Sequence, residues 1–425
     1  MDESILENII LNQNFGLKQK SKGFTRYKLN EINSFIKPNI NIVITGPRRT
    51  GKSTLLLQIM DKYYKDGYYY LNFLDERLVD FDVGDFQKAY ELFIKNYGLK
   101  KIFFFDEVQG KKGWDRFVAR MYEQGFKFFI TGSNSSLLSK EISTYLTARH
   151  KDVLLFPFSF KEFLDYNNIA LNYKITENKI NIQKKLDEYI LNGGFPEVIV
   201  NKNTDYLTTI YSDVINKDVI DRYKVKYTST FKKIGLFLLS NFSKEISYTS
   251  IKKSYELGNT NTAKKYIHYL CNSYLFFEIN KFDYSLKKQE SYSKKIYCVD
   301  TGLINKLGFA FSSNYGRLYE NIVFLELFQN NENLYFWKDK INKEVDFVVF
   351  NKNKVSEVIQ VCYNLTEPET YKRELDGLLS AIEYFKLKEG KIITKDILKT
   401  ETINHKKIYF IPLYIWLIEQ KENKN

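Results

Sequence analysis

The stretch NIVITGPRRTGKSTLLLQIMDKYYKDG, residues 41–67, decides the fold of the first part of the chain. It opens with an apolar run suited to a buried strand, and the run after Lys52 has the composition of a helix. Between them, Gly46–Thr54 matches the pattern G-x-x-x-x-G-K-[ST]. Glycines let successive backbone N–H groups point inward at phosphate oxygens, and the following helix adds its positive end. The stretch therefore predicts a phosphate-binding loop.

The chemistry of such a loop gives its polar residues separate roles. Lys52 is expected to reach the β- and γ-phosphates of ATP and to act in catalysis, and the Ser53 hydroxyl to bind Mg²⁺. The predicted nucleotide-binding residues here are Gly46, Pro47, Arg48, Arg49, Thr50, Gly51, Lys52, Ser53 and Thr54.

A second run, KIFFFDEV at 101–108, is almost wholly apolar and ends in two acids. Asp106, at the carboxyl end of a buried strand, is expected to hold the Mg²⁺. Glu107 is placed to orient and polarise the attacking water. Both are predicted catalytic residues, and the alternative is a pair of solvated acids that cap a strand.

Two further polar positions are candidates. FKFFITGSN at 126–134 ends in Ser133 and Asn134, which we expect to touch the γ-phosphate or the water; the alternative is an ordinary turn cap. Arg149 is a candidate catalytic arginine that would stabilise transition-state charge in cis or in trans. Its alternative is a surface arginine.

The chain changes character along its length. Up to about residue 150, strands apolar on both faces alternate with amphipathic helices, which predicts a parallel α/β sheet covered on both sides. Mainly helical segments follow, and strands return after about 315. The predicted organisation is an N-terminal segment 1–35, a P-loop domain 36–165, a helical region 166–227, a winged-helix-like domain 228–310 and an α/β domain 311–425.

Composition limits the surroundings and partners. The formal net charge is +13, which is compatible with a polyanion such as double-stranded DNA, but the excess of Lys, Asn and Ile is also typical of AT-rich genomes. The three cysteines are far apart and form neither a disulfide framework nor a zinc pattern. No apolar run is long enough for a membrane span, and no signal pattern opens the chain. We expect a cytoplasmic protein without membrane contact.

GPRRTGKSTLL, FFFDEVQ, ITGSN and FPFSFKEFL, followed by GGFPEVI, KKIYCVDTGL, GRLYENIVFLEL, EVDFVV and IQVCY, resemble AAA+-like P-loop ATPases of archaea and bacteria. In these, a conserved C-terminal domain of unknown function follows the ATPase module. The resemblance covers about residues 26–416. The family is similar in outline to signal-transduction ATPases with numerous domains. It implies an AAA+ core, a winged-helix module and a restriction-endonuclease-like fold. The family often has Ala-Gly-Arg where this chain has Thr147-Ala148-Arg149, which keeps the arginine and loses the glycine.

SYTSIKKSYELGNTNTAKKYIHYL at 247–270 resembles a helix-turn-helix. Gly258 marks the break, and Thr260 or Asn261 is the expected N-cap of the second helix. Lys264 and Lys265 would face a phosphate backbone if that helix entered a groove. The alternative is a packing module without a DNA role.

KEVDFVVFNKNKVSEVIQVCYNL at 343–365 resembles the core of a metal-dependent nuclease. Glu320 and Asp346 fit two acid positions of such a site, but Gln360 and Cys362 stand where Glu-x-Lys would be needed. Glu357 is nearby, yet strand alternation puts it on the other face. We therefore predict that no nuclease works here.

Together the motifs predict ATP binding and Mg²⁺-dependent hydrolysis, with a winged-helix module contacting DNA and a degenerate nuclease-like domain. Two alternatives stay open: a slow nucleotide-gated switch or interaction protein, and an ATP-licensed DNA nuclease. Self-association is also left open.

Overall fold

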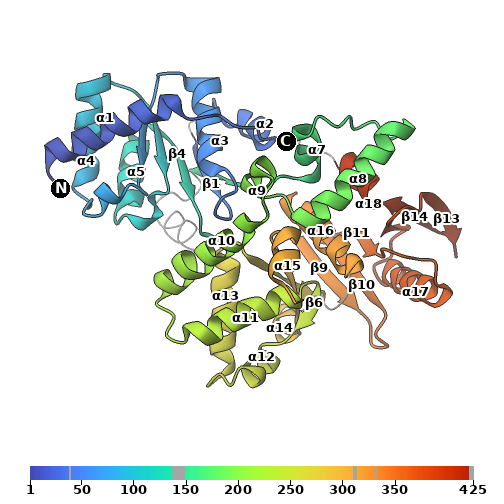
Figure 1. Cartoon of the computed structure of the whole chain (residues 1–425). Helices are drawn as coiled ribbons and strands as arrows, with labels where there is room; N and C mark the ends of the chain where they lie inside the picture. Colours follow the sequence, from blue (N-terminus) through green and yellow to red (C-terminus); the bar gives the residue numbers. More distant parts are fainter. Residues whose placement is uncertain (38–39, 136–148, 310–313, 331–332, 421–425) are drawn as a thin grey trace. The chain divides into compact units, whose positions relative to one another are not determined.

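The computed structural model describes residues 1–37, 40–135, 149–309, 314–330 and 333–420 (Figure 1). The chain divides into two compact units. Of the described residues, the first comprises 1–156 with the short segment 272–274, and the second comprises 157–271 and 275–420.

The first unit is built on a parallel five-stranded sheet with the order β2-β3-β4-β1-β5. The registers Phe105↔Ile130 and Thr45↔Gly132 bring the carboxyl ends of β3, β4 and β1 to the same edge. β4 lies between the phosphate-loop strand and the strand with the acid pair. The strands are β1 (Asn41–Thr45), β2 (Tyr69–Asn72), β3 (Ile102–Asp106), β4 (Lys127–Gly132) and β5 (His150–Leu154).

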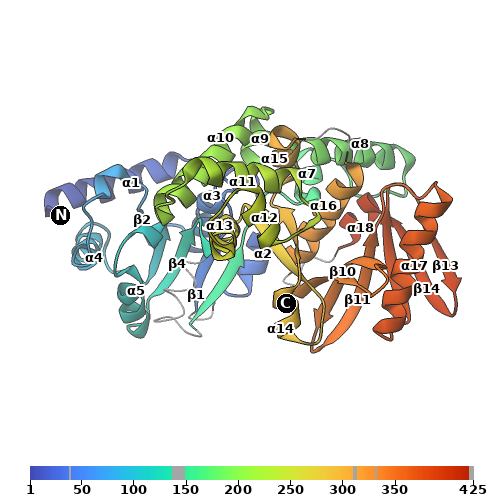
Figure 2. The same cartoon turned by 90° about the horizontal axis from the view of Figure 1, so that it is seen from below.

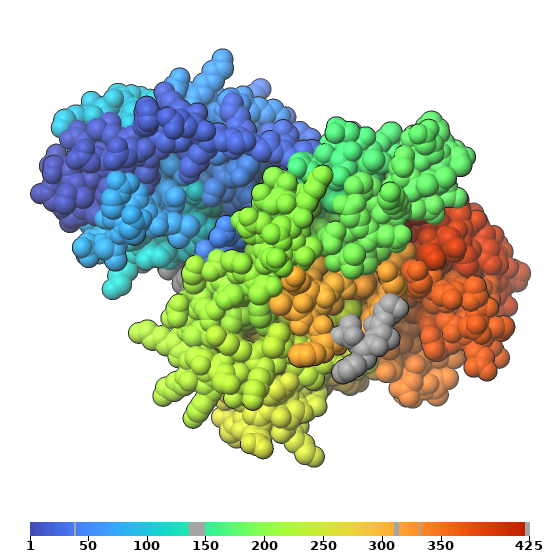
Figure 3. Space-filling model, in the orientation of Figure 1, coloured from blue at the N-terminus to red at the C-terminus, as the bar shows by residue number. Residues whose placement is uncertain are grey.

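Helices cover both faces of this sheet, as predicted, because alternate strand residues feed two apolar clusters (Figures 1 and 2). Phe103 and Phe105 pack under α1, α4 and α5, whereas Phe104 and Phe129 stack beneath α2 and α3 with ring centroids 4.6 Å apart. In the space-filling view, the N-terminal residues (dark blue) lie on the surface of this unit (Figure 3). The helices are α1 (Glu3–Gln19), α2 (Lys28–Asn33), α3 (Lys52–Ile59), continued by a π-helical turn Met60–Tyr64, α4 (Asp85–Tyr97) and α5 (Trp114–Glu123).

The second unit begins with helices, as the sequence predicts. Two Gly-containing turns meet inside it: Asp300 accepts hydrogen bonds from the backbone N–H groups of Gly194 (2.7 Å) and Leu303 (3.2 Å). The Asp300 carboxylate also fills the space that a Cβ on Gly193 would need. The helices are α7 (Phe160–Tyr166), α8 (Thr176–Asn192), α9 (Pro196–Asn201), α10 (Asp205–Asp213) with the π-helical Val214–Asp221, α11 (Thr228–Ser240), α15 (Thr301–Leu307) and α18 (Leu413–Glu419).

The segment 247–270 contains the two expected helices, α12 (Tyr248–Ser254) and α13 (Thr260–Asn272). The cap is Asn259, one residue before the expected Thr260 and two before the expected Asn261. The Asn259 side chain accepts from the Thr262 N–H at 2.8 Å, so Thr260 is the first helical residue. Lys264 and Lys265 are exposed, as their expected role requires.

One mixed sheet of nine strands, in the order β13-β14-β12-β11-β10-β9-β7-β8-β6, runs through the second unit. It crosses the boundary predicted near residue 310, because β7 pairs in parallel with β9 through Asn280↔Tyr335 and Lys281↔Phe336. The remaining elements are β6 (Lys244–Ile246), β7 (Phe276–Lys281), α14 (Leu286–Ser291), β8 (Lys294–Cys298), α16 (Tyr315–Gln329), β9 (Asn333–Lys338), β10 (Glu344–Asn351), β11 (Lys354–Val361), α17 (Pro368–Tyr384), β12 (Glu389–Thr394), β13 (Lys399–Ile403) and β14 (Lys406–Pro412).

Among the described helices, none combines the length and the apolar character needed to cross a bilayer.

Candidate functional site

The predicted phosphate loop is a tight turn between β1 and α3. Gly46 has a φ of 144°, and a Cβ there would lie 2.1 Å from the carbonyl oxygen of Leu155. Gly51 has a left-handed φ of 90° directly before Lys52, the first residue of α3. Thr50 is buried, and its hydroxyl donates to the Pro47 carbonyl at 2.9 Å. The two motif glycines are therefore required by this backbone, and the loop opens onto a helix N-terminus.

Ser53 and Asp106, the two residues predicted to share a metal ion, are in contact. The Ser53 hydroxyl donates to Asp106 Oδ1 at 3.0 Å. Thr131, on β4, donates to the same oxygen at 2.5 Å, and Tyr70, on β2, donates to Oδ2 at 3.3 Å. Burial raises the pKa of Asp106, although the Thr131 and Ser53 hydroxyls act in the opposite direction. The carboxylate is thus aimed at the first turn of α3 by neighbours on both sides.

Glu107 lies beside the predicted catalytic lysine. Its carboxylate is 3.6 Å from Lys52 Nζ, and it accepts a 2.6 Å hydrogen bond from Gln109. Burial alone would raise the pKa of Glu107, but Lys52 and Gln109 hold it below the ordinary value. Its backbone is left-handed, with a φ of 55°, and its N–H donates to Thr131 Oγ1 at 2.8 Å. Such a conformation in a residue other than glycine needs support from its surroundings, and Thr131 supplies it.

Ser133 follows β4 at the same edge of the sheet. It is 1% exposed, and its hydroxyl oxygen has no hydrogen-bond partner among the described residues. Its nearness to Glu107 contributes to the low pKa of that acid. Asn134 is also buried next to it. A buried hydroxyl with unused hydrogen-bonding capacity, beside Lys52 and Glu107, suits contact with a phosphate oxygen or a water.

Sequence reasoning did not find the residues that hold this site in place. Thr131 and Tyr70 orient Asp106, and Gln109 orients Glu107. Arg26 is buried and donates to the carbonyl oxygens of Thr50 (2.7 Å) and Phe156 (2.9 Å). Only Thr131 had a signal in the sequence, because it comes directly before the Gly-Ser-Asn end of its strand.

Arg149 is not at the phosphate loop of its own chain. Its carbonyl accepts from the N–H of Asn41 at the start of β1, whereas the loop follows the end of that strand. Its guanidinium pairs with Glu123 on α5 and lies 5.5 Å from the ring centroid of Tyr122. A strand length separates the two edges, so the expected role in cis is not supported. Thr147 and Ala148 lie outside the described residues.

The second unit contains the other predicted constellation. Glu320, on α16, and Asp346, on β10, both bind one ammonium, that of Lys295 on β8, at 3.0 and 2.9 Å. Gln360 and Cys362 line the same cavity, whereas Glu357 pairs with Lys391 and does not line it. The sequence is therefore right that the position of the Glu-x-Lys lysine, occupied here by Cys362, supplies no ammonium to this cavity. It missed that a lysine from β8 reaches the acids.

Three family models match successive parts of the chain. Residues 39–164 match the model of an AAA domain, 183–314 a domain of unknown function (DUF8612), and 315–416 a domain of unknown function (DUF4143). Uncharacterized protein MJ1544 of Methanocaldococcus jannaschii is 36% identical, over 98% of this chain and 96% of its own length. An uncharacterized protein of Haemophilus influenzae is 32% identical, over 81% of this chain and 87% of its own.

Solved structures give more distant matches. The Walker-type ATPase PABY2304 of Pyrococcus abyssi is 15% identical with a TM-score of 0.43, over 67% of this chain and 95% of its own. The Orc1 protein of Aeropyrum pernix, solved in complex with DNA, is 11% identical with a TM-score of 0.32, over 68% of this chain and 94% of its own.

The phosphate loop and its acid pair thus lie inside the matched AAA domain, at one edge of its parallel sheet. The chain belongs to the family of MJ1544, and it is an AAA-type P-loop protein whose nucleotide-binding domain precedes a C-terminal domain of the DUF4143 type.

Proposed function

We propose that the first unit binds ATP with Mg²⁺ and hydrolyses it. The observation that supports this best is the 3.0 Å hydrogen bond between Ser53 and Asp106, since it joins the helix after the phosphate loop to the acid on β3. These are oxygen donors, which Mg²⁺ prefers, and Mg²⁺ usually keeps several waters and needs few protein ligands. The bound ion would neutralise charge on the β- and γ-phosphates.

The residues of the loop then divide the work. The backbone N–H groups of residues 46–53 surround the phosphates, and Lys52, whose ammonium now donates to the carbonyls of Gly46 (3.1 Å) and Pro47 (2.9 Å), offers its charge to them. Glu107 accepts the proton of the attacking water, and its low pKa keeps it ionised for that task. Ser133 and Asn134 contact the γ-phosphate or that water.

The direct test is phosphate release from ATP by the purified chain, with Mg²⁺ and with EDTA, compared between the wild type and Lys52→Ala. Release that depends on Mg²⁺ and is lost in the variant supports the proposal. A rate that ignores Mg²⁺ or survives the substitution contradicts it. The wild-type rate also separates a turnover enzyme from a slow nucleotide-gated switch.

A role at DNA is proposed for the helices α12 and α13, which we interpret as a winged-helix module. Four lysines support it: half-buried Lys252 and exposed Lys253 in the last turn of α12, and exposed Lys264 and Lys265 near the start of α13. Lysines neutralise phosphates without reading bases, so the expected contact is independent of sequence and sensitive to salt. ATPase rates with and without double-stranded DNA test whether this contact reaches the nucleotide site. Arg149 keeps a role only in trans, in a self-associated form.

A further inference from the structure

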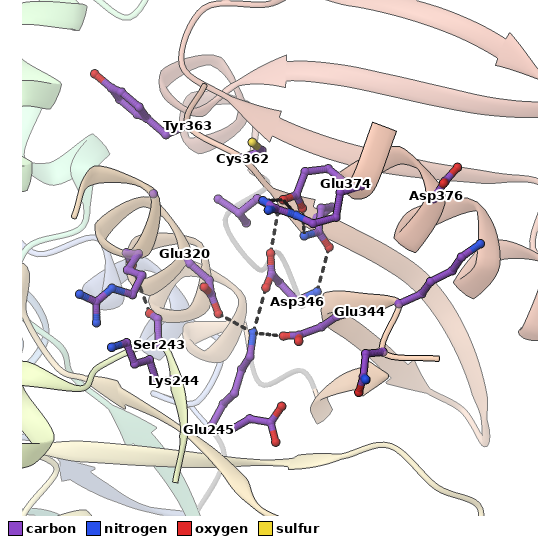
Figure 4. Close-up of a pocket in the computed structure, with 18 of the residues that line it drawn as sticks. Ser243, Lys244, Glu245, Glu320, Glu344, Asp346, Cys362, Tyr363, Glu374 and Asp376 are labelled. Carbon is purple, nitrogen blue, oxygen red and sulfur yellow. Dashed lines mark hydrogen bonds and ion pairs between the residues drawn. The ribbon is translucent and has the colours of Figure 1, made fainter. Parts of the chain in front are cut away.

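The second unit has a charged cavity of about 900 Å³ that the ATPase site does not use. Figure 4 shows Glu320, Glu344 and Asp346 converging inside this cavity. The ammonium of Lys295, which also lines the cavity, lies where they converge. The nitrogen is 3.0, 2.8 and 2.9 Å from these three carboxylates. The ammonium donates hydrogen bonds to Glu320 and Asp346 and forms an ion pair with Glu344. A phenyl ring, that of Phe336, lies 5.7 Å away.

The carboxylates around Lys295 are themselves held in place. Glu320 accepts a 2.7 Å hydrogen bond from the Tyr297 hydroxyl. The second oxygen of Asp346 accepts from the N–H of Val361 at 3.0 Å, and the N–H of Asp346 donates to Gln360 at 3.1 Å. The Gln360 amide in turn donates to Glu374 on α17. Glu320 and Asp346 therefore cannot turn away from the centre without losing buried hydrogen bonds.

Three carboxylates that converge on one point form a donor set of the kind that Mg²⁺ and Mn²⁺ take. A divalent ion of that size would need oxygens at about 2.0–2.2 Å, closer than the 2.8–3.0 Å found around the ammonium. In the part of the chain that is described, no group of three or more His, Cys, Asp or Glu side chains is spaced for a metal ion. The carboxylate oxygens are suitable metal ligands, but the Lys295 ammonium occupies the point at which they converge.

Lys295 stays protonated in this cavity. Burial alone would lower the pKa of Lys295, but Asp346 and Glu320 raise it well above the ordinary value. Burial, with the charge of Asp346, also raises the pKa of Glu320. The ammonium therefore supplies positive charge at the point where a divalent ion would otherwise lie.

We propose that Lys295 is a built-in cation of this cavity, standing at the position of a divalent metal ion, so that the wild-type cavity binds neither Mg²⁺ nor Mn²⁺. This differs from the sequence-based interpretation, in which the site fails because Gln360 and Cys362 stand where a glutamate and a lysine would be needed. A lysine is present, and its place among the acids is what excludes the ion. Removal of its charge turns the cavity into a divalent-cation site.

The test is Mn²⁺ binding, measured by electron paramagnetic resonance on the full chain without nucleotide. All proteins carry Asp106→Asn, which silences the other metal position. Lys295→Met is compared with Lys338→Met, a matched control, because Lys338 also pairs with Glu344 (3.6 Å) but points to Glu245 and stays partly exposed. We expect Lys295→Met to bind one Mn²⁺ at least tenfold more tightly than the parent and the control, and to lose it on adding Asp346→Asn.

A folded Lys295→Met chain that gains no Mn²⁺ overturns the proposal. If this variant does not fold, Mn²⁺ binding is compared between the parent and the parent with Asp346→Asn. Equal binding by the two supports the built-in cation. Binding by the parent that is lost with Asp346→Asn refutes it. Cleavage of plasmid DNA by the wild type with Mn²⁺, abolished by Asp346→Ala, would also refute it.

Discussion

Glu107→Gln is the substitution that most directly tests the proposed chemistry. It keeps the size of the side chain and removes the acceptor for the proton of the attacking water. Loss of a positioned general base slows a reaction by about 10²–10⁴-fold, which corresponds to about 3–5 kcal/mol of barrier. We therefore expect the turnover number for ATP to fall by that factor.

Binding should behave differently from turnover. Glu107 and Lys52 are 3.6 Å apart, and unit charges at that distance attract by about 4–5 kcal/mol at an effective dielectric constant of about 20. This attraction competes with phosphate for the lysine. Glutamine removes the competition and the repulsion between carboxylate and phosphate, so the affinity for ATP should be equal or higher.

The assay pairs single-turnover hydrolysis with equilibrium binding of a fluorescent ATP analogue. Glu123→Gln is the control, because it makes the same substitution at an exposed acid that pairs with Arg149 at the opposite edge of the sheet. It should leave both quantities at wild-type values. Hydrolysis by Glu107→Gln at the wild-type rate, or a loss of ATP binding, would show that Glu107 does not have the role assigned to it.

Three further outcomes follow from other contacts. Thr131→Val removes the hydroxyl that bonds both Asp106 and the Glu107 N–H, so it should cost about 1–3 kcal/mol of stability and slow hydrolysis, whereas Thr131→Ser should not; urea unfolding and phosphate release measure the two effects. Burial raises the pKa of Asp300 from 3.8 to about 7. The contribution of this residue to the free energy of unfolding is therefore full below about pH 4 and is lost as the pH rises to 7, by about 1 kcal/mol per pH unit. Asp300→Asn should abolish that slope when unfolding is followed from pH 4.5 to 7.5. Lys264→Glu with Lys265→Glu should weaken DNA binding and flatten its salt dependence in a filter-binding assay, and unchanged affinity would remove α13 from the proposed interface.

The first unit could be predicted well because its signals are local. The phosphate-loop strand, the loop and its helix are consecutive in sequence, and an apolar run that ends in polar residues marks each of β3 and β4. Parallel strands end at one edge, so Ser53, Asp106 and Ser133 had to converge once the strands were assigned to one sheet. Short β5 was missed because its sequence, HKDVL, is half polar. The choice between a cis and a trans role for Arg149 could not be predicted, because nothing local says which edge of the sheet it occupies.

The second unit shows where local signals end. Glu320 and Asp346 could be paired from their motifs, but Lys295 is 25 and 51 residues from them in sequence, in a strand whose partners are β6 and β7. Its neighbour Lys294 bonds the Gln289 carbonyl and takes no part, so even the choice between two adjacent lysines depends on strand register. The absence of a lysine at one expected position therefore does not show that the cavity lacks an ammonium, because a side chain from any neighbouring element can supply the charge. Here the supplied charge lies at the centre of the carboxylates and not beside them, and that position makes the cavity a closed cation site.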